Sequence, residues 1–187
     1  MTPVFTQRKR IDEFESAAMP HMNDLFRMGC RILGDRQRAD DVVQEVYLQA
    51  WKSFDRFEPG TNCKAWLFKI LFNCAHHYRR KWFNFRLIRE SEDVLEVAVA
   101  PTGPPPDQLT DKEILAALDR IPADFRAVVL LADVEEFAYK EVANILNIPI
   151  GTVMSRLSRA RKLLRLELRH VAAGYGIGNS KQEGRTA

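Results

Sequence analysis

The sequence is short of cysteine, of long apolar runs and of net charge. Its 187 residues include three cysteines, Cys30, Cys63 and Cys74, without a CxxC spacing. We therefore expect reduced and mostly buried thiols, in place of a disulfide framework or a cysteine-rich zinc site. No apolar run approaches the roughly 18 residues of a membrane-spanning helix, and the N-terminus carries a cluster of charges where a signal peptide would be apolar. These absences predict a cytoplasmic protein with no membrane insertion.

Alternation of apolar and polar residues, which marks a strand with one buried face, is also missing. Apolar residues recur at helical spacing in both halves of the chain, and the hydrophobic content of 46% is ordinary for a globular protein. The sequence therefore predicts an all-α fold. The expected helices cover residues 11–18, 20–33, 36–57, 62–82, 110–121, 123–133, 139–146 and 149–171.

Proline and charge divide the chain into two parts. Residues 98–108 contain four prolines and a glycine, and proline cannot continue a helix. Basic residues outnumber acidic ones by 16 to 11 over residues 1–90 and by 11 to 8 over 119–187, whereas acids lead by six to one over 91–118. Two basic parts suit a protein that meets a polyanion in two places. We predict two small helical domains at 1–90 and 108–173, a flexible acidic, proline-rich linker at 91–107 and a disordered tail at 174–187.

The second part ends in a helix-turn-helix pattern. Its turn at residues 147–149 begins with Asn147, which tolerates the left-handed backbone that often ends a helix. The free face of the next helix holds four cations and no acid from residue 151 to 162. A solvated face is one interpretation, but a polar, cationic face is also what a helix needs to enter the major groove of DNA. The buried stripe is Val153, Leu157, Ala160 and Leu164, and the predicted DNA-reading residues are Thr152, Ser155, Arg156, Ser158, Arg159 and Lys162.

The helix expected over residues 36–57 has a leucine on its polar side. Val42, Val46 and Ala50 belong to its apolar stripe, and Leu48 lies opposite them among charged and polar residues. A lone exposed leucine is ordinary, yet an apolar anchor with a polar surround is also typical of a protein-docking face. That face consists of Asp41, Gln44, Glu45, Leu48, Gln49 and Lys52.

The helix expected over residues 62–82 is apolar on most sides, with Trp66 and Phe68 as core residues. Its polar residues form one narrow stripe, and cations alternate with aromatic rings at its C-terminal end. This mixture suits single-stranded or opening DNA, because cations pair with phosphates and unstacked bases lie on rings. The residues that we expect to contact such DNA are Lys69, Asn73, His76, Arg79 and Arg80.

Three segments together carry a family resemblance. They are ADDVVQEVYLQAW at 39–51, KAWLFKI at 64–70 and IPIGTVMSRL at 148–157. In this order and spacing they resemble the extracytoplasmic-function (ECF) sigma factors, the minimal two-domain members of the housekeeping sigma family. The resemblance runs from about residue 11 to 172.

The resemblance implies a function and partners. The helix from Asp41 would bind the clamp helices of core RNA polymerase, the loop at residues 60–64 would capture a flipped base of the minus-ten promoter element through Asn62 and Lys64, and the C-terminal domain would bind the minus-thirty-five element. The linker would follow the RNA exit path. A further implied partner is an anti-sigma factor. The free chain would be a monomer and would need no cofactor. Many relatives carry a basic residue where Met154 stands, so one promoter contact is either missing or apolar here.

Three alternatives belong to other classes. A stand-alone helix-turn-helix regulator would need a ligand-binding or receiver domain in its N-terminal half, and no alternating α/β pattern is present there. A decoy that binds only an anti-sigma factor would not need the cations at Arg80, Arg156 and Arg159. An enzyme is least favoured, because the few histidines and scattered carboxylates form no recognisable nucleophile, metal or acid–base set.

Overall fold

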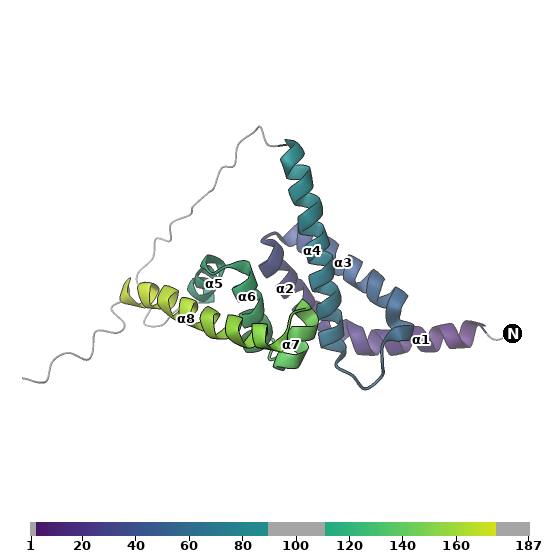
Figure 1. The fold of residues 1–187 in the computed structure, drawn as a ribbon. Helices are drawn as coiled ribbons and strands as arrows, with labels where there is room; N and C mark the ends of the chain where they lie inside the picture. Colours follow the sequence, from purple (N-terminus) through teal and green to yellow (C-terminus); the bar gives the residue numbers. More distant parts are fainter. Residues whose placement is uncertain (1–2, 90–110, 175–187) are drawn as a thin grey trace, which may run out of the picture. The chain divides into compact units, whose positions relative to one another are not determined.

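The computed structural model describes residues 3–89 and 111–174, and throughout these ranges the regular structure is helical, which confirms the predicted all-α fold (Figure 1). The predicted linker at 91–107 lies outside the described residues. So does the predicted tail at 174–187, except for its first residue, Gly174, which belongs to the last helix. The first set of elements is α1 (Pro3–Ala18), the 3-10 turn η1 (Met19–His21), α2 (Met22–Leu33), α3 (Arg36–Ser53), the 3-10 turn η2 (Phe54–Arg56) and α4 (Cys63–Arg89). The second set is α5 (Asp111–Arg120), α6 (Ala123–Val129), the π-helical turn η3 (Leu130–Val134), α7 (Tyr139–Leu146) and α8 (Ile150–Gly174).

The helices form two compact units, of which the first holds α1 to α4. Within it, α2, α3 and α4 pack against one another. Gly34 ends α2 with a left-handed φ of 69°, and the Asp35 side chain then accepts a hydrogen bond of 2.8 Å from the Arg38 N–H to begin α3. A Cβ added to Gly29 would lie 3.3 Å from the Ala39 Cβ, so these two small residues bring α2 and α3 close together.

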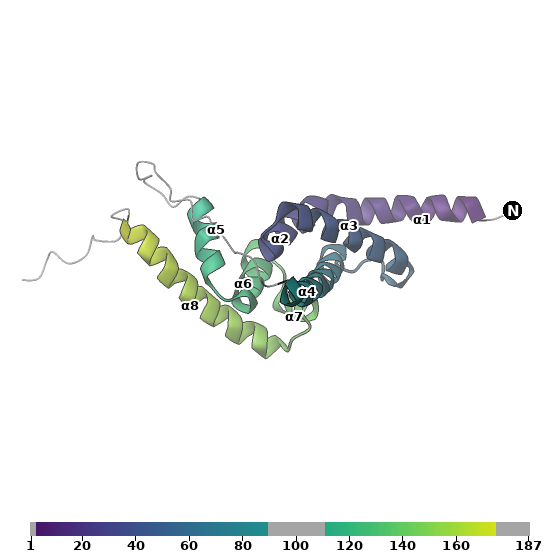
Figure 2. The same ribbon diagram turned by 90° about the horizontal axis from the view of Figure 1, so that it is seen from above.

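An aromatic cluster joins α1 to the rest of this unit. The Phe14 ring meets Trp51 and Phe54 edge-on at centroid distances of 5.3 and 5.1 Å. The Arg10 guanidinium lies 4.4 Å from the Trp51 ring centroid and 3.0 Å from a carboxylate oxygen of Asp55. Figure 2 shows that the N-terminal end of α1 projects beyond α2, α3 and α4. Ring packing and the Arg10 contacts therefore hold the C-terminal half of α1 on the unit.

The second unit is built on α8, against which α5 and α6 pack (Figures 1 and 2). The helix predicted over residues 123–133 does not stay α-helical to its end. From Leu130 the backbone widens into η3, where the Glu135 N–H donates to the Leu130 carbonyl at 2.9 Å. Glu136 then takes a left-handed φ of 59° and leads into α7. The buried side chains of this unit include Val128, Leu130, Leu131, Val153, Leu157 and Ala160.

The turn between α7 and α8 has the predicted backbone. Asn147 has a φ of 53°, which confirms the left-handed conformation expected there. The Ile148 N–H donates to the Ala143 carbonyl at 3.0 Å, and the Pro149 carbonyl accepts from Thr152 and Val153 as α8 begins. The division between the two units passes within α7.

Candidate nucleic-acid and polymerase interfaces

The polar face of α3 presents Leu48 to solvent. Its side chain is 53% exposed, whereas Val42, Val46 and Ala50 on the opposite side are buried, which confirms the predicted orientation of the helix. The Gln49 side-chain amide donates to the Glu45 carboxylate at 2.9 Å and fixes part of the polar surround. All six residues predicted for this face are exposed: Asp41, Gln44, Glu45, Leu48, Gln49 and Lys52.

The two predicted DNA contacts at the start of α4 also have partners within the protein. The Asn62 side-chain oxygen accepts a hydrogen bond of 3.1 Å from the Ala65 N–H, so Asn62 caps α4. The Lys64 ammonium lies 3.3 Å from the Asp24 carboxylate and 5.7 Å from the Phe68 ring centroid. Since the Lys64 and Asp24 side chains are both only 24% exposed, this ion pair ties α4 to α2. The sequence did not reveal either contact.

A histidine lies beside this ion pair. Burial, followed by the nearby Lys64 charge, lowers the pKa of His21, and the Asp24 carboxylate opposes that shift. Both leading causes disfavour the protonated ring. At neutral pH, Lys64 is therefore the cation of this corner and His21 is uncharged.

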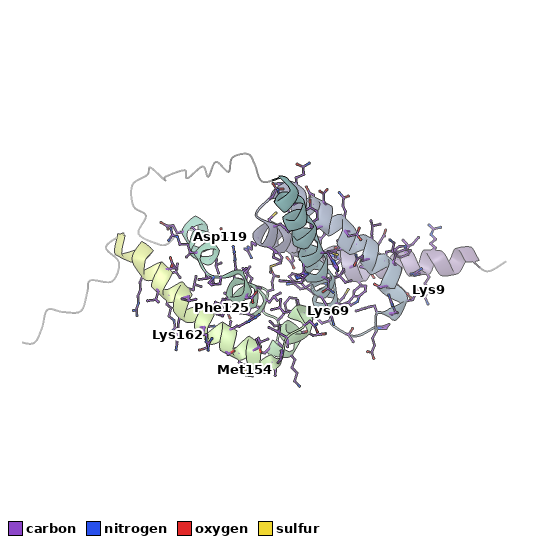
Figure 3. The ribbon with its side chains drawn as sticks, turned by 45° about the horizontal axis from the view of Figure 1, so that its top comes forward. Lys9, Lys69, Asp119, Phe125, Met154 and Lys162 are labelled. Atoms are coloured by element: carbon purple, nitrogen blue, oxygen red, sulfur yellow. The ribbon has the colours of Figure 1, made fainter. Side chains whose placement is uncertain are left out.

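The polar stripe of α4 is confirmed for the residues whose side chains are described. Asn73 and His76 are exposed, Lys69 is half-buried, and Phe68, Leu71 and Ala75 on the other side are buried. Figure 3 labels Lys69 on α4. The side chains of Arg79 and Arg80 lie outside the described part of the chain.

On α8, the predicted buried and exposed faces are largely as expected. Val153, Leu157 and Ala160 are buried, and Leu164 is half-buried. Met154 is 51% exposed, so an accessible apolar side chain stands among the predicted DNA-reading residues (Figure 3). Of the predicted DNA-reading residues, Thr152 and Arg156 are half-buried, and Ser155, Ser158, Arg159 and Lys162 are exposed.

Carboxylates from neighbouring elements bind two of the four cations that lie between residues 151 and 162 of α8. The Arg156 guanidinium lies 2.8 Å from an Asp124 oxygen. Arg161 forms a two-pronged pair with Asp133, with hydrogen bonds of 3.1 and 2.6 Å, and these bonds raise the pKa of Arg161 further above its usual range. The segment from residue 151 to 162 itself contains no acid. The carboxylates that meet its cations come from α6 and η3, and the pattern along one helix could not reveal them.

A shallow hollow of about 520 Å³ lies between the start of α6 and the exposed side of α8. Figure 3 shows Phe125 of α6 beside α8, with Met154 and Lys162 labelled along α8. Four of the six residues predicted to read DNA therefore share one concavity with the first turn of α6. Its lining is Pro122, Ala123, Asp124, Phe125, Thr152, Ser155, Arg156 and Arg159.

The three cysteines are free thiols, of which Cys74 is buried and Cys30 and Cys63 are half-buried. Burial raises the pKa of each thiol, that of Cys74 to about 11, so all three stay protonated at neutral pH. Burial also raises the pKa of Tyr47 to about 12, and its hydroxyl donates to the Ala18 carbonyl at 2.9 Å. Within the described ranges, no three His, Cys, Asp or Glu side chains are grouped so that they could hold a metal ion.

Comparison with known proteins identifies both halves of the chain. Residues 18–83 match the family model of sigma-70 region 2, and residues 111–164 match that of sigma-70 region 4. The chain is 38% identical over 152 residues to the ECF RNA polymerase sigma factor EcfG of Rhodopseudomonas palustris, an alignment that covers 79% of each protein. The chain belongs to the ECF sigma factor family. For this ECF sigma factor, the region 2 match occupies the part where a stand-alone regulator would need another domain, so that alternative is not favoured.

Two further similar proteins, SigE and RpoE, are also sigma factors. The ECF RNA polymerase sigma factor SigE of Mycolicibacterium smegmatis is 32% identical over 162 residues, which cover 81% of this chain and 63% of SigE. The sigma factor RpoE of Bartonella quintana, solved with the anti-sigma factor NepR, superposes with a TM-score of 0.68 at 31% identity, covering 84% of this chain and 97% of RpoE. CnrH, solved with the cytosolic domain of CnrY, shares the fold with a TM-score of 0.57 at 24% identity, over 88% of this chain and 90% of CnrH. Among the helices described here, none combines the length and the apolar character required to span a bilayer.

Proposed function

We propose that this ECF sigma factor binds core RNA polymerase through the polar face of α3 and reads promoter DNA with α4 and α8. In this role it is an initiation factor that directs a separate catalyst. The observation that carries the proposal is the exposed face of α8, where Ser155, Ser158, Arg159 and Lys162 lie opposite the buried Val153 and Leu157. A helix with such a face suits the major groove, in which polar side chains reach base edges and cations reach phosphates.

The polymerase contact that we propose centres on Leu48. Apolar side chains at the centre of an interface, surrounded by polar ones, supply much of the binding energy when they are desolvated. Leu48 is more than half exposed, and its neighbours Glu45 and Gln49 are held to each other by a hydrogen bond. A partner that covers this face would therefore desolvate Leu48 inside a polar surround.

Opening of the minus-ten element is assigned to the start and the polar stripe of α4. Asn62 and Lys64 are the proposed base-capturing residues, and Asn73 and His76 are exposed further along the helix. Asn62 caps the helix with its side-chain oxygen, and an amide also carries two N–H donors. The same side chain can therefore hold the start of α4 and donate to a base.

We further propose that an anti-sigma factor binds this protein and that it acts in the cytoplasm, beside core RNA polymerase. The support is the likeness to RpoE of Bartonella quintana, whose structure was solved with the anti-sigma factor NepR.

The decisive experiment adds the purified full-length chain to core RNA polymerase on fragmented genomic DNA and sequences the transcripts. A sigma factor produces discrete start sites that core polymerase alone does not produce. Upstream of those starts, two shared sequence elements should emerge at a fixed spacing. Random starts with and without the chain would contradict the proposal.

A further inference from the structure

The hollow beside α8 contains one carboxylate among its lining residues, that of Asp124. Asp124 belongs to the first turn of α6, and its side chain is 70% exposed, yet one oxygen lies 2.8 Å from the Arg156 guanidinium. The Arg156 side chain is only 29% exposed. An acid therefore stands inside the surface that we propose for duplex DNA, in contact with one of its cations.

The position of Asp124 is fixed by backbone geometry and packing. The Pro122 carbonyl accepts hydrogen bonds of 2.9 and 3.0 Å from the N–H groups of Phe125 and Arg126, which begins α6. Further along α6, Val128 and Val129 are buried, and α6 packs on α8. Because both ends of the ion pair sit on helices that pack together, the carboxylate holds Arg156 in one place on α8.

An arginine can give the same N–H donors to a carboxylate or to a DNA phosphate. A phosphate contact positions the protein but carries no sequence information, since every nucleotide has a phosphate. An unrestrained Arg156 would therefore strengthen binding to any duplex. While Asp124 occupies it, that unselective contact requires the ion pair to break.

We infer that Asp124 is a specificity-determining residue of the minus-thirty-five site, which acts by withholding Arg156 from phosphates in registers that lack correct base contacts. This inference rests on the proposed function of α8 in reading duplex DNA. On the preferred sequence, base contacts from α8 fix the position of the helix in the groove. Arg156 can then contact only the DNA atoms that lie beside it in that position. On other sequences, the carboxylate weakens binding.

The test uses holoenzyme assembled from core polymerase and the full-length chain, with duplexes in which the minus-thirty-five segment is randomised. Asp124→Asn should tighten binding to a scrambled duplex roughly fivefold at 0.15 M salt and make its salt slope steeper by about 0.9, as expected for one added phosphate contact. Binding to the duplex preferred by the unchanged chain should shift by less than about twofold. The ratio of the two affinities therefore falls, and the selected sequences become more varied.

Two controls separate this effect from general electrostatics. Asp119 is 68% exposed and pairs with Arg126 of α6, and neither residue lines the hollow, so Asp119→Asn removes the same charge without releasing a cation of the reading helix. It should leave the affinity ratio unchanged. In an Arg156→Ala background, Asp124→Asn should no longer alter the salt slope, because the cation that it would release is gone.

Each outcome decides a different claim. If Asp124→Asn tightens both duplexes equally, or acts no differently from Asp119→Asn, Asp124 does not determine specificity. If its effect on the salt slope persists without Arg156, the ion pair is not the cause. If the unchanged holoenzyme selects no sequence at all in the randomised segment, the proposed function of α8 fails, and this inference fails with it.

Discussion

Among the described residues, three large apolar side chains are more than half exposed, and they lie in different surroundings. Leu48 and Leu166 are 53% and 51% exposed on α3 and α8, and Met154 is 51% exposed near the start of α8. Single exposed apolar residues are ordinary on protein surfaces. Leu48 differs because its whole polar surround belongs to one predicted face, which makes it the natural position to test for polymerase docking.

Leu48→Glu should weaken binding to core polymerase by roughly 1 to 4 kcal/mol, because it removes the apolar anchor and places a charge in the interface. The melting temperature and helicity should hardly change, since surface substitutions usually alter stability by less than about 0.5 kcal/mol. Fluorescence titration of labelled core polymerase measures the first effect and circular dichroism the second. The matched control is Leu166→Glu, an equally exposed leucine on the other unit, which should bind normally. Equal losses from both variants would refute the proposed face.

Arg159 and Lys162 are both exposed on α8, but their substitution should change DNA binding in two different ways. We expect Arg159→Ala to cost about 1 to 3 kcal/mol at one base position and to relax selectivity there, as for loss of a base contact. Lys162→Ala should weaken all sequences alike and lower the salt slope by about one, as for loss of a phosphate contact. Holoenzyme binding to a library of minus-thirty-five sequences at several salt concentrations distinguishes the two. Unchanged sequence preference in the Arg159 variant would move base reading towards Thr152 and Ser155.

At the start of α4, one side chain stabilises the helix and is also proposed to contact DNA. Asn62 caps the helix, so its replacement by alanine would remove a cap worth about 1 kcal/mol together with any contact to DNA. Serine is an equally good cap but lacks the amide. The pair of variants therefore separates the two roles.

Asn62→Ser should retain the stability of the chain and still impair promoter opening, whereas Asn62→Ala should lose both. Permanganate footprinting reports opening, and a gel shift run beside it reports closed-complex binding. We expect opening to fall more than binding in either variant. Normal opening by Asn62→Ser would show that Asn62 serves only the helix.

Periodicity and turn chemistry predicted much of this architecture. Leu48 was placed on the polar side of its helix and Asn147 in a left-handed turn, and the structure confirms both. These features depend on neighbours within a few residues along the chain. The widening of the backbone at η3 was missed, because one extra residue in a helical turn leaves the apolar pattern almost unchanged.

The ion pairs of the predicted DNA surfaces could not be found in the same way. Lys64 pairs with Asp24, Arg156 with Asp124, and Arg161 with Asp133. In each pair the partner comes from a different helix or turn, so it depends on tertiary packing. The number of cations on one face of a helical wheel is therefore an upper limit on the number that are available to contact DNA.

For the molecule as a whole, the sequence predicts two domains separated by a linker at residues 91–107. Brief digestion of the full-length chain with Glu-C protease should cut first after Glu92 or Glu96 in the linker and after Glu183 in the predicted disordered tail. Two large fragments that resist further cleavage should remain. Packed helices protect their own glutamates, whereas an exposed linker does not. Mass spectrometry of the fragments locates the cuts. Early cleavage at Glu45 or Glu141 instead would contradict the predicted boundaries.

The aromatic cluster that fastens α1 also gives the two halves of the protein different optical properties. All three tryptophans precede residue 90, and the second unit has none. Trp51 carries the Arg10 guanidinium 4.4 Å above its ring, and Trp66 packs on Phe57 with centroids 4.9 Å apart. Tryptophan fluorescence therefore reports on the folding of the first unit alone. Release of α1 would change that emission because Trp51 would lose its contact with Arg10, while unfolding of the second unit alone would leave the emission unchanged.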